Sequence, residues 1–406
     1  MAQHNAYWFL TCPSKHTVSA GIIRNADVLI IGGGVAGLNL LYQLVISGHV
    51  NTYLVEDNTV GYHASGRGGG HLMLRGHKLF SKMPEESGVE YLHFISENNR
   101  KLLNGLRNVK FDSDVRDCGG LRLAIDDAEM SDLEQEARFI KRHRNLDCPL
   151  FDKAKVRTLL PNTGFIGGMF VPTEAIMNPY KVVNGLRELI EQKGPRVLTN
   201  SCVTGVSEND DGSLTVSIRH KGTIRTKCVV YCMNAYTPEL VPELAETMVS
   251  YRGQMIATDY LPDNTIQTFP HMGISCHDGN EYFRLYGGRL LVGGMRHAVR
   301  GQQIGIMNDG DFSPTVYDKL REFVSSALPI LGDVKYAYTW SGIMTSTPDG
   351  LPLIGALPNR RSQYIFGGFN NHGFSHALQG SILLKDIITK QEPPVKLFDP
   401  ARFQCN

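Results

Sequence analysis

The 406-residue chain has little that indicates a nucleic-acid-binding or membrane protein. Its 41 lysines and arginines nearly balance its 40 acidic residues, so a formal charge of +1 gives no strong field for nucleic acid or an anionic membrane. The most apolar stretch, Ala26 to Gly48, contains a glycine triplet together with Asn39, Tyr42 and Gln43. We therefore expect no nucleic-acid partner and no membrane insertion.

The cysteines also lack the spacing of a redox or zinc motif. They stand at Cys12, Cys118, Cys148, Cys202, Cys228, Cys232, Cys276 and Cys405 and include no Cys-x-x-Cys pair. This pattern predicts reduced, mostly buried thiols. The stretch from Met1 to Lys15 has no charged start followed by an apolar block, as a secretory signal requires, and the cytoplasm is the expected location.

Glycine is abundant, and its first cluster forms a recognisable motif. Val28 to Ile31 is a β-branched run typical of a strand, and Leu38 to Ile46 has helical periodicity. Between them Gly32, Gly34 and Gly37 satisfy G-x-G-x-x-G, which allows a tight turn, a close approach of a pyrophosphate and tight helix packing. The N-terminus of the helix then offers unpaired N–H groups and a positive dipole to the phosphates.

An acidic residue follows the next predicted strand, Thr52 to Val55. Glu56 is placed to accept the hydroxyls of an adenosine ribose, and Asp57 is the competing candidate. The order of strand, glycine turn, helix, strand and acid predicts a dinucleotide site. It does not by itself separate NAD from FAD.

Two further glycine-rich segments follow. The first is the polar loop Gly61 to His71, with the sequence Ala-Ser-Gly-Arg-Gly-Gly-Gly over 64–70. The second begins with Trp340-Ser341-Gly342, continues through Thr347-Pro348-Asp349-Gly350, and ends in Gly367 to Phe374 before a predicted helix from about Ser375 to Lys390.

With these motifs the chain resembles the glycine oxidase, sarcosine oxidase and D-amino acid oxidase superfamily of FAD enzymes, over positions 27 to 390. Within it the sequence is most similar to gamma-glutamylputrescine oxidase-like proteins, on Tyr7-Trp8, Tyr251 to Gln254 and Tyr282 to Arg284. The resemblance implies FAD as cofactor, with the last helix N-terminus beside the flavin pyrimidine. The expected cofactor-binding residues are Gly32, Gly34, Val35, Ala36, Gly37, Glu56, Ala64, Ser65, Gly66, Arg67, Gly68, Gly69, Val203, Gly342, Gly368, Asn371, His372, Gly373 and Phe374.

Three departures from the family pattern bear on the chemistry. Gly342 to Met344 contains no cysteine to attach the flavin, so noncovalent FAD is expected. Met344 stands about where relatives carry an arginine that clamps an α-carboxylate, which disfavours a simple α-amino acid. Leu290 to Val292 lack the lysine that assists oxygen in relatives. In addition, Gly68 replaces the usual asparagine of the loop.

The substrate is accordingly expected to be an amine, or a secondary amine whose acid group lies elsewhere. Arg75, Arg252 and Arg296 are the candidate anchors. His372 is the candidate catalytic residue, with helix capping as the alternative role, and His71 and His297 are weaker candidates. The inferred reaction transfers a hydride equivalent from the carbon beside a neutral amine to FAD, giving an imine that water hydrolyses.

The fold class expected from this reading is mixed α/β, with a Rossmann-like FAD-binding domain interleaved with an antiparallel-sheet substrate domain. The FAD domain is assigned residues 26–94, 166–240 and 336–395, and the substrate domain residues 95–165 and 241–335. The basic cluster in the predicted helix Met130 to Arg144 is expected to be a solvated face.

Three functions remain open at this point. The first is an FAD-dependent amine oxidase using O2, and the second is a dehydrogenase passing electrons to a quinone or carrier protein. The third is a flavin-binding protein without turnover, because no general base stands out.

Overall fold

The first glycine motif forms a strand, a turn and a helix. Strand β1 (Asn25–Ile31) is followed by helix α2 (Val35–Ile46) and strand β2 (Thr52–Val55), and β2 pairs with β1 in parallel. Most β1 side chains are buried, which explains its apolar run. The structure is a computed structural model that describes residues 6–12 and 23–404.

This unit is the centre of the first of two eight-stranded sheets. The sheet has the order β17-β18-β11-β1-β2-β8, and β10 and β9 extend it as a hairpin from β11. Its other strands are β8 (Val197–Leu198), β9 (Val203–Glu208), β10 (Leu214–Ile218), β11 (Gly222–Tyr231), β17 (Leu353–Ala356) and β18 (Gln363–Gly367). Strands β18, β11, β1, β2 and β8 run parallel, so their carboxyl ends meet at one edge.

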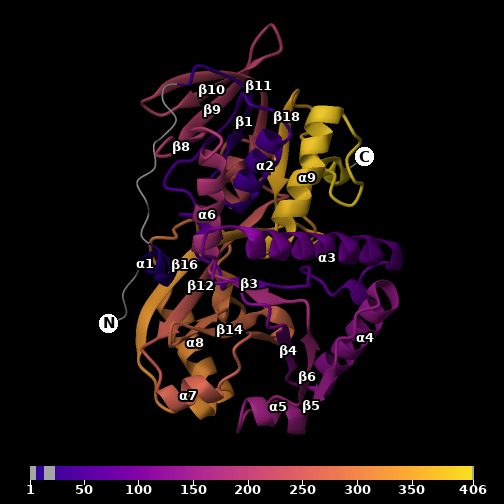
Figure 1. Ribbon diagram of the computed structural model, residues 1–406, viewed down its shortest axis with the longest axis vertical. Coiled ribbons are helices and arrows are strands. Elements are labelled where there is room, and N and C mark those ends of the chain that lie inside the picture. The colour runs from indigo at the N-terminus through magenta and orange to yellow at the C-terminus, as the bar shows by residue number, and fades with distance from the viewer. Residues whose placement is uncertain (1–5, 13–22, 405–406) are drawn as a thin grey trace.

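Helices cover this sheet and bound the core. Helix α2 packs against α6 (Pro179–Glu191) and α9 (Phe374–Lys390), and α9 packs against the long helix α3 (Glu85–Asn108). Figure 1 shows this sheet in the upper half of the molecule, with α3 crossing below it. Fully buried residues such as Ile30, Leu54 and Phe366 fill the space between the sheet and the helices.

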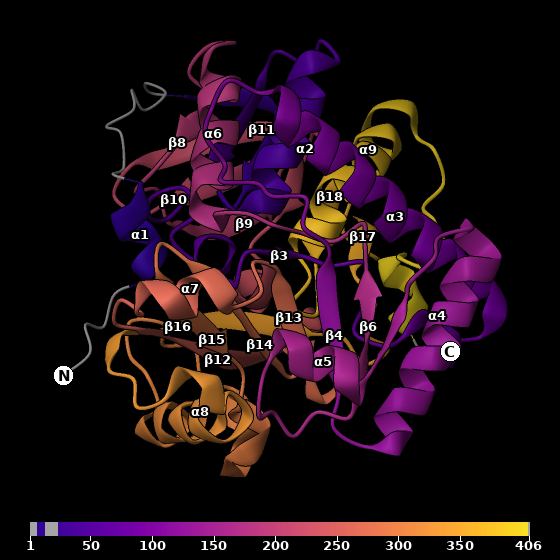
Figure 2. The same cartoon turned by 60° about the horizontal axis from the view of Figure 1, so that its bottom comes forward.

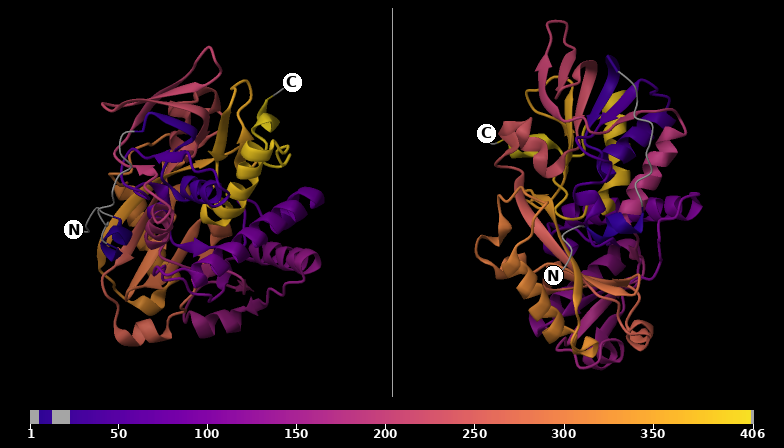
Figure 3. Two further views of the ribbon diagram at one scale, coloured as in Figure 1. Left: turned by 45° about the horizontal axis from the view of Figure 1, so that its top comes forward. Right: turned by 90° about the vertical axis from the view of Figure 1, so that its left-hand side faces the viewer.

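The second sheet has the order β16-β12-β15-β14-β13-β4-β6-β5 and is antiparallel except between β13 and β4. Its strands are β4 (Gly120–Ala124), β5 (Leu150–Asp152), β6 (Gly167–Val171), β12 (Val249–Thr258), β13 (Gly273–Cys276), β14 (Glu281–Tyr286), β15 (Arg289–Gly293) and β16 (Tyr336–Ser346). Its helices are α4 (Asp127–Arg144), α5 (Lys153–Leu159), α7 (Asp263–Thr268) and α8 (Pro314–Ala327). Figure 2 shows α8 and α4 at opposite flanks of this sheet, and Figure 3 shows the two halves from further sides.

Small elements join the two halves. The short helix α1 (Tyr7–Thr11) inserts Trp8, which is fully buried beside Trp340 of the second sheet. A two-stranded ladder pairs β3 (His71–Leu72), at the end of the second glycine loop, with β7 (Ala175–Ile176). The mixed α/β class with a parallel and an antiparallel sheet is confirmed.

Most expected elements are present, and their ends differ for local reasons. Helix α4 begins at Asp127, before the expected Met130, because the Asp126 side chain caps it by accepting the N–H of Glu129. Strand β11, for which no bounds were predicted, extends back to Gly222 because its first half pairs with β10 in an antiparallel ladder. The basic cluster at the end of α4 is a solvated face, since Arg138 and Arg142 are exposed and pair with surface carboxylates.

The sheets also show how the expected domain division relates to hydrogen bonding. Strands β6 and β16, assigned by sequence to the FAD domain, are hydrogen-bonded into the second sheet. Strand β16 enters it through its long ladder with β12 and brings Gly342 to the boundary between the two halves. The domain boundaries themselves stay a prediction.

The cysteines agree with the expectation where they are described. Cys148, Cys228, Cys232 and Cys276 are buried, and these four form no disulfide, nor do Cys118 and Cys202. Cys405 and much of the stretch from Met1 to Lys15 lie outside the described residues. Among the described helices, none is long and apolar enough to cross a membrane.

Candidate active site

The glycine turn after β1 leaves no room for side chains. Gly32 has a φ of 112°, and a Cβ there would lie 2.6 Å from the carbonyl oxygen of Cys232. A Cβ on Gly37 would lie 2.1 Å from the carbonyl oxygen of Gly32. Both positions therefore require glycine, the first for its backbone conformation and the second for the contact of α2 with the turn.

Gly34 is the residue at which the turn meets the second glycine loop. A Cβ on Gly34 would lie 2.8 Å from Ser65 Oγ, and the N–H of Val35 donates to the same oxygen at 3.0 Å. No acidic residue occupies the first turn of α2. The open backbone and the dipole of α2 suit a pyrophosphate at this point.

Glu56 is buried at the end of β2, and its carboxylate faces the turn. Oε2 accepts the N–H of Gly33 at 2.6 Å, and Oε1 accepts the N–H of Asn58 at 2.9 Å. Burial and the neighbouring Asp57 raise the pKa of Glu56. In the described part of the chain no lysine or arginine forms an ion pair with this carboxylate, so hydroxyl donors of a ribose would satisfy it.

The competing acid, Asp57, is engaged elsewhere. Its carboxylate contacts His63 Nε2 at 3.1 Å, and His63 Nδ1 contacts Asp309 Oδ2 at 3.1 Å. Burial lowers the pKa of His63, but the hydrogen bonds with Asp309 and Asp57 raise it overall to about 10. His63 is therefore a cation between two carboxylates, a bridge that sequence analysis missed because the segment around Asp309 carries no motif.

These residues line one cavity, which we call the cofactor cavity. Its walls include Gly32, Gly34, Glu56, Ala64, Ser65 and Val203, together with Tyr62, Cys232, Asn234, Tyr236 and Ile343. Val203 comes from the antiparallel extension of the first sheet, yet it lies opposite the glycine turn. The expected residues Val35, Ala36 and Gly37 continue from the same turn into α2.

The second glycine loop is held in place mainly through Arg67. Its buried guanidinium donates to the carbonyl oxygens of Tyr62, Asp309 and Ser341. Its own carbonyl oxygen accepts the indole N–H of Trp340 at 2.8 Å. Arg67 thus connects the glycine loop to Ser341 and Trp340 of β16.

Other carbonyl groups of this loop are also held by hydrogen bonds. The Gly68 carbonyl accepts a hydrogen bond from the indole N–H of Trp8 at 2.7 Å, and the Gly70 carbonyl accepts one from Nη1 of Arg284 at 2.9 Å. Arg284 is fully buried against the Trp8 ring, and burial lowers its pKa to about 10. Arg284 belongs to a segment that resembles relatives in sequence, and in the structure it holds the glycine loop through its hydrogen bond to the Gly70 carbonyl.

The C-terminal motif approaches from β18. Gly368, Asn370 and Asn371 have φ values of 70°, 47° and 75°, so the chain turns sharply before α9. The Asn370 side chain holds this turn by accepting the N–H of Thr347 at 3.0 Å, and the Tyr251 hydroxyl donates to Asn371 Oδ1. Gly373 and Phe374 then begin α9.

A second cavity of about 450 Å³ lies between this turn and the second sheet, and we call it the substrate cavity. Its lining includes Gly253, Gln254, Tyr282 and Met344 from the sheet, Asn371 and His372 from the turn, and Arg75, His77, Lys78, Lys82, Asp132, Asp278, Gly294, Arg296 and His297 from surrounding segments. Of the three candidate anchors, it contains Arg75 and Arg296.

The three arginines are in different situations. Arg75 is 4% exposed and donates to the backbone and carboxylate of Asp278. The guanidinium of Arg296 lies 4.0 Å from the centre of the Tyr251 ring. Arg252 does not line the substrate cavity, because its guanidinium donates to Gln303 Oε1 and the carbonyl of Asn308.

Two buried histidines near this cavity, His372 and His71, are held neutral by their surroundings. Burial and then Arg75 lower the pKa of His372 well below its usual value. Burial and then Arg284 lower the pKa of His71 to about 3, and its Nε2 has no hydrogen-bond partner within the described chain. His297 Nδ1 lies 3.3 Å from Glu281 and is half-exposed.

The fold, the glycine turn and the buried acid at the end of β2 are those of a dinucleotide-dependent oxidoreductase. The chain belongs to the DAO family of FAD-dependent oxidoreductases, whose model matches residues 27–385. The chain is 25% identical over 401 residues to gamma-glutamylputrescine oxidoreductase of Escherichia coli, covering 96% of this chain and 90% of that one.

Solved structures agree on the fold. L-proline dehydrogenase from P. horikoshii superposes with a TM-score of 0.80 at 19% identity, over 94% of this chain and 98% of that one. Glycine oxidase from Geobacillus kaustophilus superposes with a TM-score of 0.77 at 20% identity, over 94% and 99%. FAD is accordingly the cofactor, and the Gly34 cradle and the buried Glu56 carboxylate fit its pyrophosphate and ribose.

Proposed function

We propose that this enzyme oxidises the C–N bond of an amine or an N-substituted amino acid to an imine, with O2 as electron acceptor and H2O2 as product. The observation that carries the proposal is the substrate cavity. It is bounded on one side by Met344 and His372, which belong to the segments expected at the flavin, and it contains the cationic groups of Arg75 and Arg296. An amine with an acidic group away from its reacting carbon suits this arrangement.

The cofactor would be bound through groups already described. The Gly32–Gly37 turn and the α2 N-terminus would hold the pyrophosphate, and Glu56 the ribose. Loop 61–70 and the Gly368–Phe374 segment would line the flavin. When bound, FAD supplies a hydride acceptor. We propose noncovalent attachment because Gly342 to Met344 contain no thiol.

The chain would act on the substrate by charge and position. A neutral amine is needed, because the nitrogen lone pair must assist the departing hydride. The charge of Arg75 is balanced by Asp278, so Arg296 is the arginine that would lower the pKa of a bound amine and favour its neutral form. His372, itself neutral, would orient the amine by a hydrogen bond, and water would then hydrolyse the imine.

A second candidate function differs only in the electron acceptor. Leu290, Leu291 and Val292 are fully buried apolar residues of β15, in the segment where relatives carry the lysine that assists oxygen. This observation favours a dehydrogenase that passes electrons to a quinone or a carrier protein. The cytoplasmic location also stays a proposal, based on the cysteine pattern of the sequence.

The test is anaerobic titration of the yellow protein with matched amines that differ only in a distal carboxylate. We expect bleaching of the visible flavin band by the carboxylated member, followed by reoxidation and equimolar H2O2 when air is admitted. Bleaching without reoxidation in air would establish the dehydrogenase. A flavin that no amine bleaches would contradict the proposed substrate class, and flavin that stays with acid-precipitated protein would contradict noncovalent binding.

A further inference from the structure

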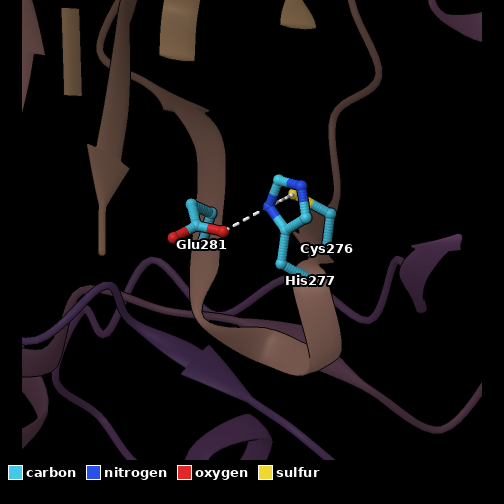
Figure 4. A group of neighbouring side chains, drawn as sticks. All are labelled: Cys276, His277 and Glu281. Atoms are coloured by element: carbon cyan, nitrogen blue, oxygen red, sulfur yellow. Dashed lines mark hydrogen bonds and ion pairs between the residues drawn. The ribbon is translucent and has the colours of Figure 1, made fainter. Parts of the chain in front are cut away.

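The turn between β13 and β14 brings together three side chains of metal-binding type, which we call the hairpin cluster. Figure 4 shows Cys276, at the end of β13, His277, in the turn, and Glu281, at the start of β14. Cys276 Sγ, a ring nitrogen of His277 and a carboxylate oxygen of Glu281 all lie within 4.8 Å of one another. The cluster takes no part in the mechanism proposed above.

Glu281 is the most unusual member, because its carboxylate is completely buried. Its side chain is 0% exposed, Oε1 accepts the N–H of Met295 at 3.1 Å, and Oε2 pairs with Nδ1 of His277. In the described ranges its ion-pair partners are two histidines, His277 and His297, with no lysine or arginine. A buried carboxylate needs a compensating positive charge, and a metal ion can supply it.

The backbone of the turn holds His277 against this carboxylate. His277 and Asp278 have φ values of 48° and 52°, and Gly279 follows with 80°. Two successive non-glycine residues in the left-handed region cost conformational energy, so other contacts must stabilise the turn. The Nδ1 atom of His277 faces both Glu281 Oε2 and Cys276 Sγ, the latter at 3.7 Å.

Cys276 completes the donor set with a sulfur atom. Its side chain is 1% exposed, and burial followed by the charges of Glu281 and Glu129 raises the pKa of its thiol. A bound metal ion would deprotonate the thiol and also neutralise Glu281.

We propose that the hairpin cluster binds a divalent transition-metal ion of the zinc type through Cys276 Sγ, His277 Nδ1 and the Glu281 carboxylate. The combination of sulfur, nitrogen and oxygen donors selects Zn²⁺ or Co²⁺ over Mg²⁺ or Ca²⁺, which prefer oxygen alone. His297, whose Nδ1 lies 3.3 Å from Glu281 Oε1, contacts the other oxygen of this carboxylate and lies outside the group of three ligand atoms. Ordinary zinc spacings miss this set, because two ligands are adjacent in sequence.

The position of the cluster gives the metal a structural effect on the substrate cavity. Asp278, Gly279 and Asn280, which separate His277 from Glu281, all line that cavity. Asp278 binds Arg75 through both its carbonyl and its carboxylate. A metal that fixes the turn would therefore position Arg75, a consequence that rests on the proposed function.

The deciding experiment is cobalt titration of the chelator-treated holoenzyme, read as a difference spectrum against the metal-free flavoprotein. We expect about one equivalent of Co²⁺ to bind, with a near-ultraviolet sulfur-to-cobalt charge-transfer band that Zn²⁺ abolishes by displacement. Absence of that band, or cobalt bound without it, would overturn the proposal. The readout requires no substrate, so it stands apart from any failure of the amine oxidoreductase assignment.

Variants then assign the ligands. Cys276→Ala and the milder His277→Ala, whose side chain is one-third exposed, should each lose stoichiometric cobalt binding while keeping the flavin spectrum. Cys148→Ala removes another buried thiol and should bind cobalt as the wild type does. Retention of the charge-transfer band in Cys276→Ala would overturn the assignment. With an active carboxylated amine, metal removal should raise KM with little change in kcat.

Discussion

The two cavities of this enzyme are built in different ways. The cofactor cavity depends on backbone at its glycine turn, where Gly32 and Gly34 contribute conformation and space, and Glu56 contributes one buried carboxylate at a strand end. The substrate cavity is made of long side chains, including Arg75, Lys82 and Arg296, brought together from separate segments. The cofactor cavity, called the backbone site below, tolerates few substitutions at its glycines. The substrate cavity, called the side-chain site, can be altered by replacing one side chain at a time.

The largest effect is expected at the centre of the backbone site. Gly34→Val would place a branched side chain where even a Cβ would lie 2.8 Å from Ser65 Oγ, at the turn proposed to hold the pyrophosphate. We expect FAD affinity to fall by about 100-fold or more, equivalent to roughly 3 kcal/mol. Flavin content after purification and FAD titration of the apoprotein measure it. Gly105→Ala in α3, whose Cβ would meet nothing within 4 Å, is the control and should remain yellow.

A smaller and more selective effect is expected in the side-chain site. Arg296→Met should raise KM for a carboxylated amine by about ten- to 100-fold, because a charged hydrogen bond contributes roughly 1.5–3 kcal/mol. FAD content should not change. Arg252→Met removes an arginine that lies outside the substrate cavity and should alter KM much less. Equal effects of the two substitutions, measured by steady-state kinetics, would contradict the assignment of Arg296 over Arg252.

The buried Glu56 of the backbone site should make the stability of the apoprotein depend on pH. Since burial and Asp57 raise the pKa of Glu56, the folded apoprotein holds a proton that the unfolded chain releases. Stability should therefore fall as pH rises from 4.5 towards about 8, by up to about 1.4 kcal/mol per pH unit from this group. Glu56→Gln should remove that contribution. Denaturant unfolding of both apoproteins at several pH values gives the difference, and parallel pH profiles would exclude Glu56 as its source.

The smallest effect is expected at His372. Its pKa is lowered well below its usual value by burial and by Arg75, so it stays neutral over the working pH range. His372→Asn should lower kcat by less than about tenfold and leave the midpoints of the kcat/KM pH profile unchanged, since general-base catalysis typically contributes 10²–10⁴-fold. The exposed His271→Asn serves as the control. Loss of a limb of the profile in His372→Asn would show that His372 titrates during turnover.

The same contrast explains what could be predicted from sequence. The glycine turn, Glu56 and the order of β1, α2 and β2 were predictable because neighbours along the chain make them. The placement of Arg252 outside the substrate cavity was not, because it depends on Gln303 and Asn308 in a loop without regular structure. The hairpin cluster was also missed, since a turn with left-handed residues, rather than spacing, brings Glu281 to Cys276.

Hydrogen bonding around the second glycine loop has a consequence for biosynthesis. The loop is synthesised early, but its partners Arg284 and Trp340 are synthesised much later. Strand β1 likewise pairs with β11, which is synthesised almost 200 residues later. Trp8, near the start, can bind Gly68 only as this loop takes shape. We therefore expect flavin binding to follow the synthesis of most of the chain, because incomplete translation products lack these contacts.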